Sequence, residues 1–344
     1  MSVRDEILEQ PAATARLLNE GGPAIEAVGR AVRQRAVEHV VIAARGTSDH
    51  AAIYAQYLFG VALRIPVALA APSIVSLYGV EPRFARSLVI GISQSGASPD
   101  VVGVVEAAHR QGVPTIAITN EPSSPLAVAA EHVIDVRAGP ELAVAATKTY
   151  TAELVAIARL VEAIRGTGEE RALREVPAAI EAALAAEDVA RAVAVAHAGM
   201  RTATVLGRGF EYATVREWAL KLKELARVVA DPYSAADFRH GPLALVEPGF
   251  PVLAVAPSGA VAADLIALLR EIRGEYRGDL VVLSDRPEIR DLGQWAIPLP
   301  GGVPDHLGPI VSIVPAQLFA YHLTIARGLD PDAPRHISKV TRTR

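Results

Sequence analysis

The stretch SLVIGISQSGASPD, residues 87–100, changes abruptly from apolar to polar. Residues 87–93 form a short run rich in Ile and Val, which predicts a strand buried on both faces. Pro99 and the spacing of the apolar residues over 100–112 predict a helix that ends at Gly112. A buried strand that leads directly into a helix is typical of a parallel α/β sheet covered by helices on both faces.

The rest of the first half repeats this alternation of strand and helix. Four more short apolar runs lie at residues 39–44, 66–71, 114–119 and 132–136. Helical patterns separate several of them. We therefore expect a doubly wound, flavodoxin-like parallel sheet in the first half of the chain.

The second half of the chain repeats the plan of the first. VIAARG ending at Gly46 matches TVLGRG ending at Gly209, and LVIGISQSG ending at Gly96 matches VLAVAPSG ending at Gly259, both at an offset of 163 residues. We predict two tandem copies of one α/β domain. The expected boundaries are 25–168 for the first domain, 169–196 for a helical connection, 197–330 for the second domain and 331–344 for a tail.

Composition narrows the class of protein. The 344 residues include no cysteine, which excludes disulfides and thiolate metal sites. Their net charge of -4 gives no basic stripe for nucleic acid. No apolar run approaches the roughly 20 residues that span a bilayer, and the charged amino terminus has no signal-peptide layout. No spacing among the nine histidines suggests a metal site. We expect a cytoplasmic protein that acts on a small molecule, with no cofactor, no metal and no nucleic-acid or membrane partner.

Lysine is rare in this chain. The 34 basic residues comprise 30 arginines and four lysines, namely Lys148, Lys221, Lys223 and Lys339. A position that keeps lysine where arginine would serve is a candidate for a compact ammonium or for an amine that can lose its proton. The alternative is four leftover surface lysines.

The loop SQSGAS, residues 93–98, lies beyond the carboxyl end of its strand, where α/β sheets bind ligands. Unpaired N–H groups and the positive end of the helix dipole favour a phosphate there. The loop adds four side-chain donors, Ser93, Gln94, Ser95 and Ser98. A plain helix cap by Ser98 is the alternative, but it accounts for only one of the four. A serine nucleophile elbow is disfavoured, because GISQS ends in Ser95 instead of glycine.

Two other loops give weaker signals. RGTSDH, residues 45–50, ends another strand and carries Gly46, Thr47 and Ser48. These residues could reach the same ligand if the two strands are neighbours, and a helix cap is the alternative. LGRGFEY in the second half has Tyr212 where the third glycine of a dinucleotide fingerprint belongs, so a nicotinamide enzyme is unsupported.

The second copy has APSGAV where the first has SQSGAS, so we expect one phosphate site and not two. What it has instead is a helix followed by a loop over residues 217–246. Lys221 and Glu224 are three residues apart and share a face of this helix. His240 precedes a Gly-Pro pair in the loop. On local grounds, a surface ion pair and a packed histidine remain the alternatives.

Six motifs in this order resemble the two-domain sugar isomerase (SIS) family: RGTS, SQSGAS, VAATKT, GRGFEYATVREWALKLKE, FRHGPLAL and PRHISK. The resemblance covers about residues 38–339. This family includes the isomerase module of glucosamine-6-phosphate synthase, free-standing SIS-type glucosamine-6-phosphate deaminases and fructosamine-6-phosphate deglycases. The resemblance therefore implies two tandem SIS domains and a phosphorylated sugar as substrate.

The resemblance also implies roles for single residues. Phosphate binding falls on the polar residues of the two first-domain loops, Ser48, Ser93, Gln94, Ser95 and Ser98. Glu224 would move the proton between C1 and C2, with Lys221 supporting the site. His240 would open the sugar ring in the active site of the neighbouring subunit, which implies a homodimer with shared active sites. Lys339 could form a Schiff base with the open-chain ketose.

Two departures from the synthase bear on the reaction. Ala146 stands where the synthase has a serine that contacts the sugar, and no glutaminase domain precedes the first strand, so we expect no glutaminase activity. We predict an aldose-ketose type isomerase that converts glucosamine 6-phosphate to fructose 6-phosphate and ammonia. A fructosamine-6-phosphate deglycase is the alternative reaction. A sugar-phosphate sensor without turnover is the alternative from another class.

Overall fold

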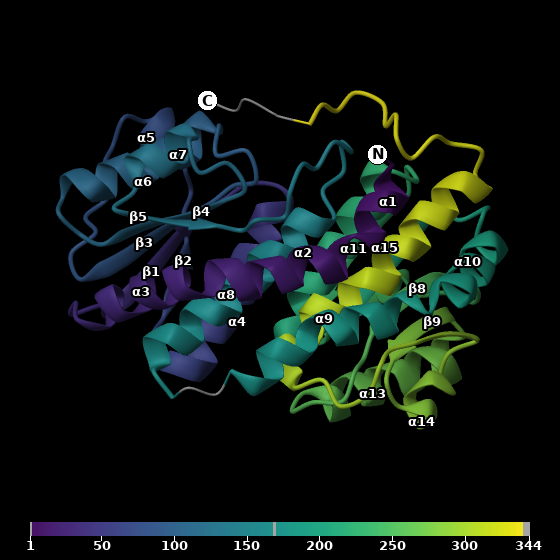
Figure 1. Ribbon diagram of the computed structural model, residues 1–344. Coiled ribbons are helices and arrows are strands. Elements are labelled where there is room, and N and C mark those ends of the chain that lie inside the picture. Colours follow the sequence, from purple (N-terminus) through teal and green to yellow (C-terminus); the bar gives the residue numbers. More distant parts are fainter. Residues whose placement is uncertain (1, 168–169, 340–344) are drawn as a thin grey trace. The chain divides into compact units, whose positions relative to one another are not determined.

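The computed structural model describes residues 2–167 and 170–339 (Figure 1). The chain folds into two compact units that interleave in sequence. The first-sheet unit comprises residues 12–142, 148–175 and those from Ser338 onward, and the second-sheet unit comprises 1–11, 143–147 and 176–337. The domain boundaries expected at 168, 196 and 330 remain predictions.

The first-sheet unit is built on five parallel strands. They are β1 (His39–Ala43), β2 (Val67–Leu69), β3 (Ser87–Ile92), β4 (Thr115–Thr119) and β5 (His132–Asp135). Their order across the sheet is β2-β1-β3-β4-β5. Every residue of β3 and β4 is buried, as expected for apolar strands covered on both faces. The predicted parallel α/β sheet is confirmed.

Helices cover both faces of this sheet (Figure 1). One face carries α5 (Ser73–Ser76), α6 (Pro99–Arg110) and α7 (Pro125–Ala129). The other carries α3 (Gly22–Arg33), α4 (Thr47–Leu63) and α8 (Lys148–Arg165). Before α3, the chain forms α2 (Gln10–Arg16) and a π-helical segment (Leu17–Gly21). A core of buried Val, Ala and Leu side chains between α6 and the sheet holds the loop after β3 in place.

The second-sheet unit repeats the same topology. Its strands are β6 (Thr202–Gly207), β7 (Val229–Ser234), β8 (Pro251–Val255), β9 (Asp279–Ser284) and β10 (Trp295–Pro298). Their order, β10-β9-β8-β6-β7, is that of the first sheet with each strand replaced by its repeat. The predicted tandem repeat is therefore confirmed. The expectation of a loop directly after the helix of residues 217–224 was wrong, because β7 lies there as an edge strand, where Asp231 and Pro232 are tolerated.

In the described part of the chain, this unit contains seven whole α-helices, most of α9 (Arg171–Leu184, from Val176 onward) and the first two residues of α2. The seven are α1 (Val3–Leu8), α10 (Glu187–Ala196), α11 (Tyr212–Glu224), α12 (Ala235–Arg239), α13 (Ala262–Glu271), α14 (Pro287–Arg290) and α15 (Gly308–Ala326). Four shorter helical segments accompany them: η2 (Gly209–Glu211), η3 (Pro242–Leu245), η4 (Ile272–Tyr276) and η5 (Asp305–Leu307).

In the described part of the chain, one helical segment, Asp305–Ala326, is long and apolar enough to span a membrane by length and composition alone. This corrects the expectation that no apolar run approaches that length. Inside the protein, 78% of its apolar window is buried. The segment contains α15, which packs against α10 and α11 as a core helix of the second-sheet unit.

Both sheets contain a point where the chain reverses direction across the sheet. From β1 the chain moves outward to β2 and then crosses back to β3 on the opposite side of β1, and β6, β7 and β8 repeat this path. The loops after β1 and β3 consequently lead to helices on opposite faces. The crevice between two such loops is where open α/β sheets bind ligands.

Candidate functional site

The loop after β3 turns sharply at Gly96. This glycine has a φ of +59°, and a Cβ placed on it would lie 2.0 Å from the Oγ of Ser124. Only glycine combines that backbone conformation with so close a neighbour. The turn brings the loop back on itself, so that the hydroxyl oxygens of Ser93 and Ser95 accept backbone N–H groups of Gly96 and Ala97, at 3.2 and 3.3 Å. Because a hydroxyl can also donate, both serines keep a hydrogen for a ligand.

Ser98 occupies the N-cap position of α6 with extended backbone angles, but its side chain makes no capping hydrogen bond. The helix-cap alternative is therefore wrong for its hydroxyl. In the described part of the chain, no hydrogen bond engages the Gln94 side-chain amide either. The loop thus presents polar side chains that the fold itself does not use, at the positive end of a 12-residue helix.

The loop after β1 lies beside this one because β1 pairs with β3 along the whole length of β1. α4 begins at Thr47, and Gly46 takes the N-cap position with a φ of +56° and no side-chain cap. Ser48 is buried, and its hydroxyl donates to Glu153 at 2.9 Å. The structure therefore brings the two predicted loops together at the reversal point, with Ser48 engaged by a carboxylate that the sequence had not pointed to.

An open hollow of about 620 Å³ adjoins the loop after β3. Its lining includes Gln94, Ser95, Asn120, Arg137 and Glu141. Glu141 is buried, and its carboxylate accepts hydrogen bonds from the Thr149 backbone at 3.1 Å and from the Thr149 hydroxyl at 2.7 Å. The same carboxylate forms an ion pair of 2.7 Å with the Nζ of Lys339. The amine that the resemblance implied for a Schiff base is thus fixed on the wall of this hollow.

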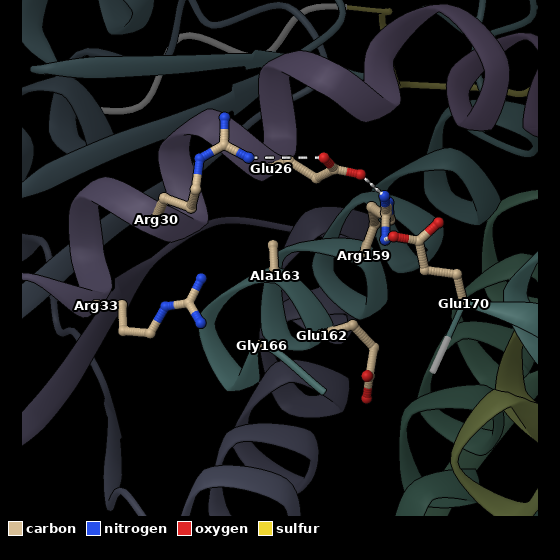
Figure 2. A pocket seen from close by; sticks show the side chains of 8 residues that line it. All are labelled: Glu26, Arg30, Arg33, Arg159, Glu162, Ala163, Gly166 and Glu170. Atoms are coloured by element: carbon tan, nitrogen blue, oxygen red, sulfur yellow. Dashed lines mark hydrogen bonds and ion pairs between the residues drawn. The ribbon is translucent and has the colours of Figure 1, made fainter. Parts of the chain in front are cut away.

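A second hollow in the first-sheet unit, of about 180 Å³, lies between α3 and α8 and contains none of the predicted site residues (Figure 2). Arg159 lies at its edge and pairs with both Glu26 and Glu170, the latter at 2.7 Å. Arg30 lies 3.7 Å from Glu26. These ion pairs give Arg159 a structural role, because its bond to Glu26 links α8 to α3.

In the second-sheet unit, α11 carries a buried cluster of charges. The Nζ of Lys221 lies 2.6 Å from Glu224 and 3.3 Å from Glu217, and its side chain is 1% exposed. Burial alone would lower the pKa of Lys221, but the charges of Glu217 and Glu224 outweigh burial and raise that pKa well above its usual range. Lys221 is therefore a permanent ammonium, and the surface ion-pair alternative is wrong.

Glu224 is the partly exposed member of this cluster, with 23% of its side chain accessible, whereas Glu217 is fully buried. The ammonium thus holds one carboxylate inside the protein and a second at the surface. Glu217 had not been predicted, although its four-residue spacing from Lys221 could have indicated it.

His240 ends α12 and is exposed, followed by Gly241 with a φ of +138°. The alternative of a packed histidine is therefore wrong. His240, Lys221 and Glu224 belong to the second-sheet unit, whereas the two loops and Lys339 belong to the first-sheet unit. Lys148 is buried at the start of α8, so of the four lysines only Lys223 is an exposed side chain of the ordinary kind.

These features define a class of protein. Residues 35–163 and 198–327 each match the SIS domain. The chain belongs to the SIS domain family, with two such domains in tandem.

Curated relatives narrow the comparison. The chain is 37% identical over 338 residues to the glutamine–fructose-6-phosphate aminotransferase (isomerizing) of Methanothermobacter thermautotrophicus, and 35% identical over 340 residues to that of Pyrococcus horikoshii. Each match covers 97% of this chain and 56% of the relative. The chain thus spans little more than half the length of these relatives.

Solved structures agree with this assignment. A Silicibacter pomeroyi protein provisionally named a phosphosugar isomerase is 34% identical, with a TM-score of 0.84 over 96% of this chain and 100% of that one. The C-terminal domain of glucosamine-fructose-6-phosphate aminotransferase from Francisella tularensis is 26% identical, with a TM-score of 0.86 over 96% and 98%. Glucosamine-6-phosphate deaminase from Thermotoga maritima, 23% identical with a TM-score of 0.80 over 100% of both chains, shares the fold.

Proposed function

We propose that this chain is a phosphosugar isomerase that converts glucosamine 6-phosphate to fructose 6-phosphate and ammonia. The observation that carries the proposal is the loop of residues 93–98 at a helix N-terminus. Ser98 makes no capping bond there, and the Ser93 and Ser95 hydroxyls accept backbone N–H groups but keep a hydrogen to donate. Such a site suits a phosphate group. The names of the relatives, which include a phosphosugar isomerase and a glucosamine-6-phosphate deaminase, support the same class of substrate.

The proposed chemistry is a proton transfer between neighbouring carbons. After His240 assists ring opening to the aldehyde, Glu224 removes the proton from C2 and returns it to C1. The amine-bearing carbon C2 thereby becomes an imine, and water hydrolyses the imine to the ketone and ammonia. The ammonium of Lys221, 2.6 Å from Glu224, would hold that carboxylate in place and support its negative charge before it takes the C2 proton and after it returns the proton to C1.

Lys339 has a proposed role in the last step. Its amine could add to C2 and release ammonia, leaving a ketimine that water hydrolyses. Glu141 would position that amine, because its carboxylate is fixed by Thr149 and binds the Nζ of Lys339. We further propose that the protein is a homodimer in which His240 serves the site of the partner subunit.

The test is an assay against glucosamine 6-phosphate and a panel of 6-phosphorylated fructosamines, with separate measurement of ammonia and of free amino acid. Release of ammonia from glucosamine 6-phosphate is the expected result. Glu224→Gln should lower kcat by about 10²- to 10⁴-fold and leave inorganic phosphate binding unchanged. The matched control Glu106→Gln, an exposed position on α6, should keep full activity.

Other outcomes would replace this proposal. Release of an amino acid in place of ammonia would establish the deglycase reaction. Thermal stabilisation by sugar phosphates without any product would favour a sensor. Full turnover in Glu224→Gln would remove Glu224 from the mechanism whichever substrate is used.

A further inference from the structure

The second sheet has its own crevice at the carboxyl ends of β8, β9 and β10, where acidic side chains take the place of the hydrogen-bond donors found in the first sheet. A cavity of about 20 Å³ lies there, enough for one water-sized occupant. Its polar lining consists of Ser258, Asp285, Asp305 and Ser312, next to Gly308. Where the first sheet offers donors, this position offers carboxylates.

The hydrogen-bond donors near this cavity are already committed. The N–H and the hydroxyl of Ser258 both donate to Asp285, at 2.7 and 2.6 Å, and the N–H of Ala260 donates to Asp305 at 3.1 Å. Ser312 donates its hydroxyl hydrogen to Glu211 at 2.6 Å. The cavity therefore presents oxygen lone pairs, which suit a positively charged occupant.

Glu211 supplies an independent observation. It follows β6 in η2, is 3% exposed, and receives the hydroxyl hydrogens of Thr214 and Ser312 on Oε2. Its other oxygen, Oε1, is buried without a hydrogen-bond partner. A Cβ built on Gly308, which lines the cavity, would lie 2.6 Å from Oε1. A buried carboxylate oxygen without a donor thus adjoins the cavity.

In the described part of the chain, these acids have hydroxyl and backbone donors but no basic side chain as a partner. Within residues 2–167 and 170–339, no ion pair joins Glu211, Asp285 or Asp305 to a Lys, Arg or His side chain. Burial raises the pKa of Glu211 to about 7 in spite of the hydrogen bonds from Ser312 and Thr214, and the charge of Asp305 adds a smaller effect in the same direction. The uncompensated negative charge favours an occupant that brings one positive charge.

We propose that this crevice binds a monovalent cation of the size of K⁺ or NH₄⁺. Serine and carboxylate oxygens are hard ligands, and the cavity holds a single ion. A divalent metal is disfavoured, because the described part of the chain contains no set of three acidic or histidine side chains arranged to ligate one. The cation would face Glu211 and Asp305 and offset their repulsion.

The experiment measures the melting temperature of the full chain at pH 7.5 in chloride salts of K⁺, NH₄⁺, Na⁺ and N-methyl-D-glucamine, at constant ionic strength. A site for a small cation predicts a saturable rise in Tm of at least about 2 °C with K⁺ or NH₄⁺ over N-methyl-D-glucamine, which is too large for the cavity. Glu211→Gln and Asp305→Asn should each remove most of this rise. Asp264 on α13 pairs with Arg208, and Asp264→Asn should keep the rise in Tm.

Equal melting temperatures in all four salts would overturn the proposal and leave a bound water as the occupant. An undiminished potassium effect in Glu211→Gln would also overturn it, because the cation would then bind elsewhere. If that variant does not fold, Asp285→Asn gives the same test at a residue that lines the cavity. None of these readouts depends on enzyme activity, so they stand apart from the proposed function.

Discussion

Lys221 and Lys223 lie two residues apart on α11 in contrasting surroundings. Lys221 is buried between two carboxylates, whereas Lys223 is exposed. Replacing Lys221 with Met would remove the ammonium that pairs with buried Glu217 and with Glu224. We expect Lys221→Met to lower the free energy of unfolding by about 3–5 kcal/mol, and Lys223→Met to change it by less than about 0.5 kcal/mol.

Tryptophan fluorescence during urea unfolding measures this difference. Both tryptophans of the chain, Trp218 and Trp295, belong to the second-sheet unit, so their emission reports on the unit that contains Lys221. Similar losses in the two variants would show that the buried ion pairs contribute no more than a surface lysine.

Glu211 makes the stability of the second-sheet unit depend on pH. Its pKa of about 7 in the folded protein lies above the ordinary 4.5, so folding takes up a proton in the interval between these values. The contribution of this group to stability is therefore full below pH 4.5 and is lost as the pH rises through 7. At about 1.4 kcal/mol per pKa unit, the loss amounts to about 3 kcal/mol.

Glu211→Gln removes this titration. Relative to the wild type, the variant should gain about 2–3 kcal/mol of unfolding free energy between pH 5 and pH 8, measured by urea unfolding in N-methyl-D-glucamine chloride. Glu288→Gln, at an exposed position, should show no such trend. A difference between variant and wild type that does not change with pH would contradict the assigned pKa.

At the scale of elements, Ser98 and Ser124 stand at the starts of α6 and α7 with different tasks. The Ser124 hydroxyl accepts the N–H of Ala127 at 3.3 Å, whereas Ser98 makes no such bond. We expect Ser124→Ala to cost about 1 kcal/mol of stability, the usual effect of losing an N-cap, and Ser98→Ala to cost less than about 0.5 kcal/mol.

Ser98 should matter for the binding of phosphate instead of for stability. Ser98→Ala should weaken the binding of inorganic phosphate several-fold by calorimetry, because we propose that its hydroxyl donates to the phosphate. A Ser98→Ala variant that is destabilised like Ser124→Ala and binds phosphate normally would return Ser98 to the role of a helix cap.

The sequence predicted elements best where both faces are buried. All five strands of the first sheet were placed to within two residues, because a strand covered on both sides needs a continuous run of apolar residues. β7 was missed because it is an edge strand, and its Asp231 and Pro232 read as a loop.

The candidate site was predictable only in part for a related reason. The spacing of Lys221 and Glu224 revealed that they share a helix face, but helical periodicity does not tell which face is covered by the rest of the protein. The contact between Glu141 and Lys339 joins residues 198 positions apart, and no local pattern indicates it. Tertiary packing decides both features.

At the scale of the whole molecule, the proposed dimer can be tested by complementation. If His240 acts in the site of the partner subunit, mixing the inactive variants Glu224→Gln and His240→Ala should restore about a quarter of wild-type activity, because half of the randomly formed dimers carry one intact site. Light scattering on the same mixture checks that dimers are present. Dimers without restored activity would place His240 in the site of its own subunit, and monomers would exclude sharing altogether.

Because the two sheets have the same strand order, the two halves of this chain can be compared position by position. Each half is a natural variant of the other, made on the same backbone plan and subject to the same folding requirements. Positions that agree between the halves, such as Gly96 and Gly259, serve the fold, whereas positions that differ at the ends of equivalent strands serve whatever each crevice holds. Comparing equivalent positions of the two halves therefore separates residues that the fold requires from residues that bind ligands.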